Sequence, residues 1–197
     1  MDIADGEPFD NSPKPFDLGI VRRDQHAHAE VLRAMRARAE QWGVAQGFEV
    51  VDAALVRTAE GVEVTIRLSS TTAEMCTVRT NALHAIQLQL TVEPKSWTAW
   101  IAARLGNRFE TADRVFDEHW CIETDDELVA QRLIDARVRT ALLTTPIWCR
   151  VSYANGQIEL QLDSGEEKLT GRHLLAATEV AIALARATPE PPTTPYR

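Results

Sequence analysis

The spacing of hydrophobic residues changes along the chain, and it predicts a helix near the amino-terminal end. Between residues 24 and 43, apolar side chains recur every three or four positions, with charged residues between them. Asp24 can cap the first turn of this helix, which is expected to end near Gly43. The spacing therefore predicts an amphipathic helix that packs along one stripe.

Strict alternation of apolar and polar residues follows the helix, and it is typical of strands with one buried face. The residues at 59–61 suit a turn before the clearest of these strands. Four segments are expected to form an antiparallel meander with one face in water: 50–57, 62–69, 75–79 and 86–93.

In the second half of the chain, the predicted helices and strands follow one another in turn. A short helix is predicted from Ser96 to Gly106, and a strand over residues 118–123. Thr124 and Glu127 have the spacing of a capping box, before a helix that continues, with a bend, towards Pro146.

The dipeptide Asn155-Gly156 predicts a hairpin. It separates the apolar segments 148–153 and 157–162, and the pair favours a type I′ turn because both central residues need a positive φ. A last helix, capped by Thr170, is apolar on nearly all sides as far as Leu184, so other elements are expected to cover it.

Antiparallel strands with helices segregated between them predict the α+β class. Residues 1–16 and 188–197 are rich in proline and polar residues, and both are expected to be flexible arms. Residues 17–187 are expected to form the α+β domain, either as one unit or as two packed halves, 17–106 and 107–187.

The formal net charge of −8 disfavours nucleic acid and anionic membranes as partners. Most of the basic residues are arginines, which is typical of GC-rich bacterial genomes. No apolar run approaches the roughly 20 residues of a membrane-spanning helix, and the acidic beginning does not suit a signal peptide. We therefore expect a bacterial, cytoplasmic protein.

Three cysteines, Cys76, Cys121 and Cys149, are an odd number without a close pair. This pattern disfavours a disulfide framework and lacks the spacing of a zinc or redox motif. We expect all three to be buried thiols with structural roles, Cys149 sharing a face with Val151 and Tyr153.

The segment from Phe116 to Asp126 resembles the pattern F-D-x-x-F-x-V-x-S-x-D of a bacterial family of uncharacterised proteins. In that family the pattern precedes a leucine-rich helix, a β-hairpin and a hydrophobic last helix. The resemblance covers roughly the second half of the chain and implies no catalytic residue.

The densest group of reactive side chains is Asp117, Glu118, His119 and Cys121. A thiol nucleophile requires a nearby histidine and acid, but same-face neighbours on a strand lie about 7 Å apart, too far for a direct hydrogen bond. In an extended strand either Cys121 or Trp120 should face solvent, and Asp117 is expected to accept hydrogen bonds from nearby backbone amides.

His26 and Glu30 have the i, i+4 spacing of a helical ligand pair, but no second cluster completes a metal site. No metal is therefore predicted. The nucleotide-binding and hydrolase motifs are also missing from the sequence, so no cofactor is predicted.

The sequence is compatible with two classes of function. The first is a non-catalytic module that binds a protein partner or a second copy of itself. The second is a small-ligand binder or enzyme with a pocket between the meander and the last helix, where Trp97, Trp100 and His119 would form the rim. The spacing of the tryptophans matches the apolar stripes and favours the core instead: Trp42, Trp97, Trp100, Trp120 and Trp148.

Overall fold

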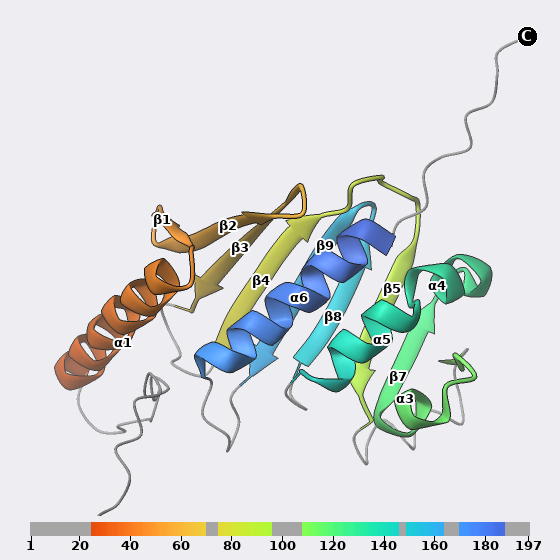
Figure 1. The fold of residues 1–197 in the computed structure, drawn as a ribbon. Coiled ribbons are helices and arrows are strands. Elements are labelled where there is room, and N and C mark those ends of the chain that lie inside the picture. Colours follow the sequence, from red (N-terminus) through yellow and green to blue (C-terminus); the bar gives the residue numbers. More distant parts are fainter. Residues whose placement is uncertain (1–24, 70–74, 96–107, 146–148, 164–169, 188–197) are drawn as a thin grey trace, which may run out of the picture.

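A computed structural model describes residues 25–69, 75–95, 108–145, 149–163 and 170–187 of the chain (Figure 1). The helix predicted from Ser96 to Gly106 and both predicted arms lie outside the described residues. Within the described ranges, no helix has the combined length and apolar character needed to cross a membrane.

One antiparallel sheet organises the molecule, and the predicted α+β class is confirmed. Its described strands run in the spatial order β1-β2-β3-β4-β9-β8-β5-β7-β6. Every recorded strand pair is antiparallel. The strands are β1 (Glu49–Val51), β2 (Ala54–Ala59), β3 (Val62–Leu68), β4 (Met75–Asn81), β5 (Gln89–Pro94), β6 (Arg108–Phe109), β7 (Trp120–Thr124), β8 (Cys149–Ala154) and β9 (Gln157–Asp163).

The expected strand at 50–57 was wrong, because the chain turns back within it. Asp52 and Ala53 adopt φ angles of 47° and 59°, and this tight turn makes a hairpin of β1 and β2. Turns of two left-handed residues usually contain glycine, and this one does not. The alternating segment therefore carries no turn signal.

The hairpin at Asn155-Gly156 is confirmed, with φ angles of 51° and 85°. Its strands β8 and β9 lie between β4 and β5, so the predicted fourth strand of the meander does not pair with the third. That strand also starts late, at Gln89, because residues 82–88 cross the end of the hairpin. Tyr153 fixes this crossing segment through its hydroxyl, which accepts a hydrogen bond from the backbone N of Ile86 at 3.1 Å.

The described helices are α1 (Gln25–Ala45), α3 (Arg114–His119), α4 (Glu127–Leu133), α5 (Ala136–Leu143) and α6 (Gly171–Ala187). Aspartates cap three of them: Asp113, Asp126 and Asp135 accept hydrogen bonds from backbone amides in the first turns. The expected cap at Thr124 was therefore wrong by two residues. Asp135 also divides the predicted bent helix into α4 and α5.

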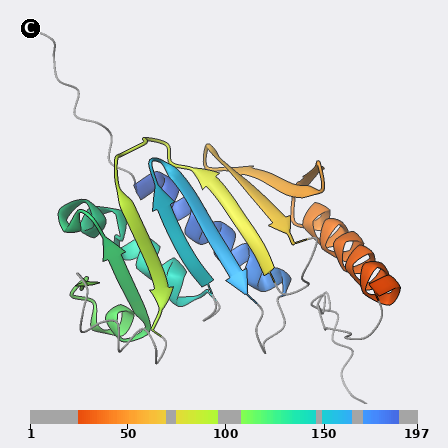
Figure 2. The same cartoon turned by 180° about the vertical axis from the view of Figure 1, so that it is seen from behind.

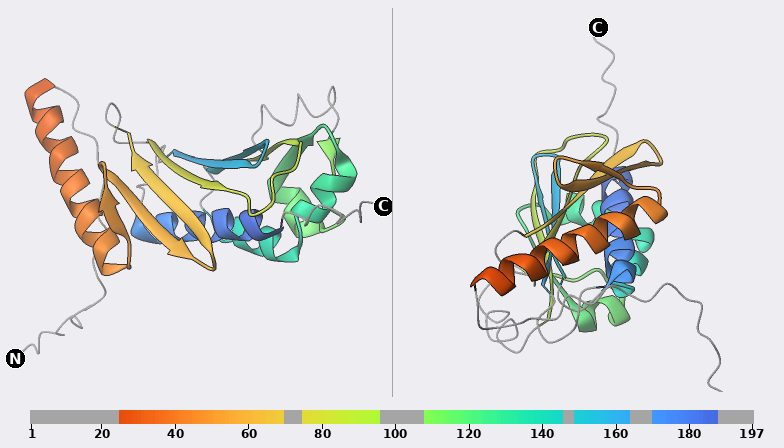
Figure 3. Two further views of the ribbon diagram at one scale, coloured as in Figure 1. Left: turned by 90° about the horizontal axis from the view of Figure 1, so that it is seen from above. Right: turned by 90° about the vertical axis from the view of Figure 1, so that its left-hand side faces the viewer.

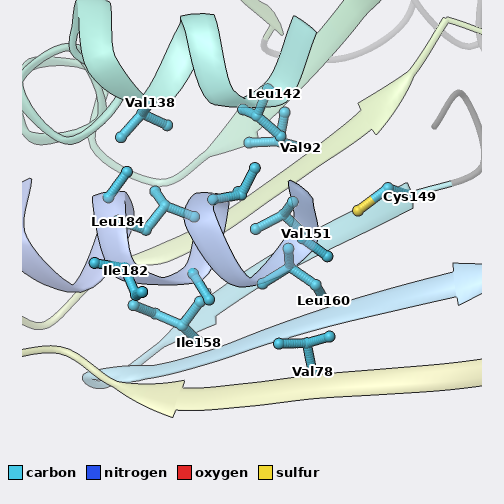
Figure 4. Packing of buried hydrophobic residues seen from close by; sticks show 14 of the residues in the cluster. Val78, Val92, Val138, Leu142, Cys149, Val151, Ile158, Leu160, Ile182 and Leu184 are labelled. Carbon is cyan, nitrogen blue, oxygen red and sulfur yellow. The ribbon is translucent and has the colours of Figure 1, made fainter. Parts of the chain in front are cut away.

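Helices α3 to α6 cover one face of the sheet, and the other face carries no described helix (Figures 1 and 2). Seen from above, α6 runs under the curved sheet (Figure 3). The predicted burial of α6 is confirmed, since Leu174, Val180 and Leu184 are fully buried. Figure 4 shows the apolar contacts between α5, α6 and the strands, from Val78, Val92, Val138, Leu142, Cys149, Val151, Ile158, Leu160, Ile182 and Leu184.

Helix α1 packs through its carboxyl-terminal end. It ends at Ala45, close to the expected end near Gly43. The missing side chain at Gly43 leaves space for Leu55, which would lie 2.7 Å from a Cβ there. The Trp42 ring similarly lies against Gly171 at the start of α6 and 6.1 Å from the Phe48 ring.

An ion-pair cluster joins the turn between β2 and β3 to the helix layer. Glu60 lies 3.0 Å from a guanidinium nitrogen of Arg137 on α5 and 2.8 Å from one of Arg186 on α6. The hydrogen bond from Arg137, together with the charges of both arginines, outweighs the opposing desolvation effect and lowers the pKa of Glu60.

Candidate functional site

The sheet face opposite α6, which we call the open face, carries polar side chains in register across its strands. Alternation places the apolar residues of each strand under the helices and sends their neighbours to this side. One row follows from the strand pairing, each residue directly opposite the next: Thr65, Arg79, Glu159, Ser152, Thr91 and Glu123.

Two hollows lie on the open face. The larger, of about 750 Å³, lies over β3, β4, β9 and β8, and Glu63, Asn81 and Gln157 contribute to its lining. The smaller, of about 470 Å³, lies over β8, β5 and β7. Ser152 and Ala154 line both, so the hollows adjoin. We call the two together the polar trough.

Two side chains hold the carboxylate of Glu159 in place within the trough. Arg79 Nε donates to one of its oxygens at 2.7 Å, and Gln161 Nε2 donates to the other at 2.9 Å. The Gln161 amide lowers the pKa of Glu159 most, and Arg79 lowers it further against a desolvation effect that raises it. The carboxylate is thus held ionised and fixed in orientation.

Three other acids line the trough. Glu63 and Asp125 form no ion pair among the described side chains, and Glu123 lies directly opposite Arg108 of β6 in the strand pairing. Glu63 lies at the β3 end, and Glu123 and Asp125 at the β7 end. Asp125 accepts a hydrogen bond from the backbone N of Gln89 at 2.9 Å, which fixes its position beside the smaller hollow. Negative charge is therefore present at both ends of the trough.

Of the three predicted rim residues, the structure describes only His119, so the rim as a whole stays a prediction. Trp97 and Trp100 lie outside the described residues. His119 is an exposed residue at the end of α3, where its Nδ1 lies 2.9 Å from the carbonyl oxygen of Val115. The space between sheet and last helix, where the pocket was expected, is lined by buried apolar side chains.

The cluster around Cys121 differs from its expected geometry. The strand there begins at Trp120 rather than Glu118, so His119 belongs to a helix and does not share a strand face with Cys121. Both Trp120 and Cys121 are buried, at 5% and 3% exposure, whereas one of them was expected to face solvent. Asp117 accepts hydrogen bonds from the backbone N and the hydroxyl of Thr111, which confirms its predicted capping role.

The three cysteines are buried and form no disulfide, as expected. Burial raises the pKa of Cys149 to about 12 and raises that of Cys76 as well. Both thiols therefore stay protonated near neutral pH. Among the residues that the structure describes, no group of three histidine, cysteine or acidic side chains is placed to hold a metal ion.

Comparison with known proteins shows a likeness of fold but no match of sequence. The chain matches no model of a known protein family, and no curated protein matches its sequence. Its fold is similar to the crystal structure of the mycobacterial trehalose monomycolate transport factor A, TtfA. The TM-score is 0.51 at 12% sequence identity, over 82% of this chain and 99% of the other. The two chains thus share an architecture while differing at most positions.

Proposed function

We propose that this chain is a non-catalytic accessory protein of a bacterial cell, and that it binds a protein partner through the open face of its sheet. The observation that carries the proposal is the polar trough, a hollowed surface on the face that no described helix covers. The opposite face is already occupied by the packed core.

Rigidity of the surface supports this role. Each central strand of the open face is hydrogen bonded on both sides, and its alternate residues are anchored in the core beneath α5 and α6. A surface held in this way presents side chains in a fixed arrangement, which reduces the entropic cost of binding a partner. The trough is therefore better suited to recognition than a mobile loop.

The fold likeness supports an accessory role more than an enzymatic one. TtfA is named as a transport factor rather than for a reaction. The three described cysteines are buried thiols that form no disulfide, and this supports a place in the reducing cytoplasm.

Site-specific photocrosslinking in the source bacterium tests the proposal. A photoreactive amino acid replaces Thr91, which lines the trough, or Glu179, which is exposed on α6. We expect a discrete crosslinked product from position 91 and none of the same mass from position 179. A product of twice the chain mass would identify a second copy as the partner. Equal crosslinking from both positions, or none from position 91, would contradict binding through the open face.

A further inference from the structure

We propose that the polar trough binds an extended, positively charged polypeptide segment, which crosses the strands from Glu63 at one end to Glu123 and Asp125 at the other. This inference rests on the proposed function and specifies the chemistry of the partner. It follows from the charge of the trough, the separation of its acids and the small side chains between them.

The charges that line the trough are unbalanced. Among the described side chains, four carboxylates and one guanidinium contribute to the lining, a formal charge of −3. Arg79 is engaged by Glu159, with which it forms the 2.7 Å ion pair. Glu63 at one end and Asp125 at the other form no ion pair with a described side chain, so a cationic ligand gains at both ends. Glu123 lies directly opposite Arg108 in the pairing of β7 with β6.

The acids are spaced for a chain of several residues. Five steps between neighbouring strands separate β3 from β7. At about 4.8 Å for each step, Glu63 and Glu123 lie roughly 24 Å apart. An extended polypeptide advances about 3.3 Å per residue, so about seven residues span this distance. Two basic positions separated by about seven residues match the two ends.

The middle of the trough suits a polypeptide backbone. Ser152 and Ala154 have small side chains and line both hollows, which leaves room for a chain to pass from one to the other. The side-chain amides of Asn81, Gln157 and Gln89 line the same surface, and each can both donate and accept hydrogen bonds. Backbone peptide groups need this combination.

A defined peptide tests the assignment. The probe is a fluorescent nine-residue peptide with two lysines at each end and five serine or glycine residues between them. Its Kd for the full chain is measured by fluorescence anisotropy at about 50 and 150 mM salt. We expect weaker binding at the higher concentration, because salt screens exposed charges.

Matched variants separate the trough from the charge of the whole chain. The Glu63→Gln/Glu123→Gln pair removes two trough charges, and the Glu127→Gln/Glu179→Gln pair removes two exposed charges from the helix layer. The first pair should raise the Kd about 3- to 10-fold, and the second by less than about 2-fold. Arg79→Gln removes the one cation among the described side chains that line the trough, and it should lower the Kd. Circular dichroism verifies that each variant is folded.

Three results would overturn the assignment: no binding of the probe, equal weakening by the two pairs, or weaker binding after Arg79→Gln. Each remains distinct from failure of the proposed function. A crosslink from position 91 combined with no charge effect would retain the open face as the binding surface and exclude a basic segment. Absence of both would exclude the surface altogether.

Discussion

Replacing Gly156 by alanine tests how the β8–β9 hairpin is joined to the segment that crosses it. Gly156 has a φ of +85°, and a Cβ placed there would lie 2.7 Å from the Cβ of Ala85 and 3.1 Å from its Cα. Gly61 provides a matched control. It follows Glu60 in a turn with the same left-handed pair, its φ is +79°, and no atom lies within 4 Å of an added Cβ.

Both substitutions place alanine at a positive φ, but only Gly156→Ala also brings a Cβ into close contact with another residue. A left-handed φ costs alanine roughly 1 to 2 kcal/mol, and the reduced entropy of the unfolded chain returns about 0.4 to 1 kcal/mol. Gly61→Ala should therefore lower the free energy of unfolding by about 1 kcal/mol. Gly156→Ala must also displace residues around Ala85, and overpacking of this kind adds about 1 to 3 kcal/mol. Its total should be about 2 to 4 kcal/mol.

Urea denaturation followed by far-ultraviolet circular dichroism measures both free energies of unfolding. Adding Ala85→Gly to Gly156→Ala removes the closest contact and should restore part of the lost stability, whereas adding it to Gly61→Ala should not. Equal losses for the two glycine variants would refute the close packing of the crossing segment on the hairpin turn.

Three further predictions concern the helix layer and the core. Gly171→Ala should lower the free energy of unfolding by about 1 to 2 kcal/mol, because its Cβ would lie 2.3 Å from the Trp42 ring; in a Trp42→Leu background, urea titration should show little or no loss. Cys76 and Cys149 should react with a thiol reagent at neutral pH only as fast as the chain unfolds, and rapid labelling of the folded protein would contradict their burial. The folded-state pKa of Glu60 is lowered, so its ion pairs stabilise the fold above its ordinary pKa of 4.5 and are lost as the pH falls through the folded value. Glu60→Gln should therefore reduce stability at neutral pH and show a smaller loss on acidification, measured as Tm against pH.

Sequence patterns correctly predicted those elements whose conformation depends mainly on residues close together in the chain. Asn155-Gly156 specifies its turn through backbone preference, and the apolar character of α6 follows from its central position under the sheet. Prediction failed where two nearby residues could each take the same structural role. The cap of α4 is Asp126 although Thr124 has the capping-box spacing, because both residues are good caps and sequence alone does not rank them.

The candidate site shows a different limit. Alternation identifies Glu63 and Glu123 as polar positions on their strands, but it does not say that residues sixty positions apart lie along one trough. A simple meander would have placed β5 beside β4 and brought Thr91 next to Arg79. Instead the β8–β9 hairpin lies between them and supplies Ser152, Ala154, Gln157 and Glu159 to the lining. The hairpin at Asn155-Gly156 was predicted from the sequence, yet its position in the sheet, which forms the middle of the trough, was not. Strand pairing across long separations depends on the packing of the whole core rather than on any local pattern.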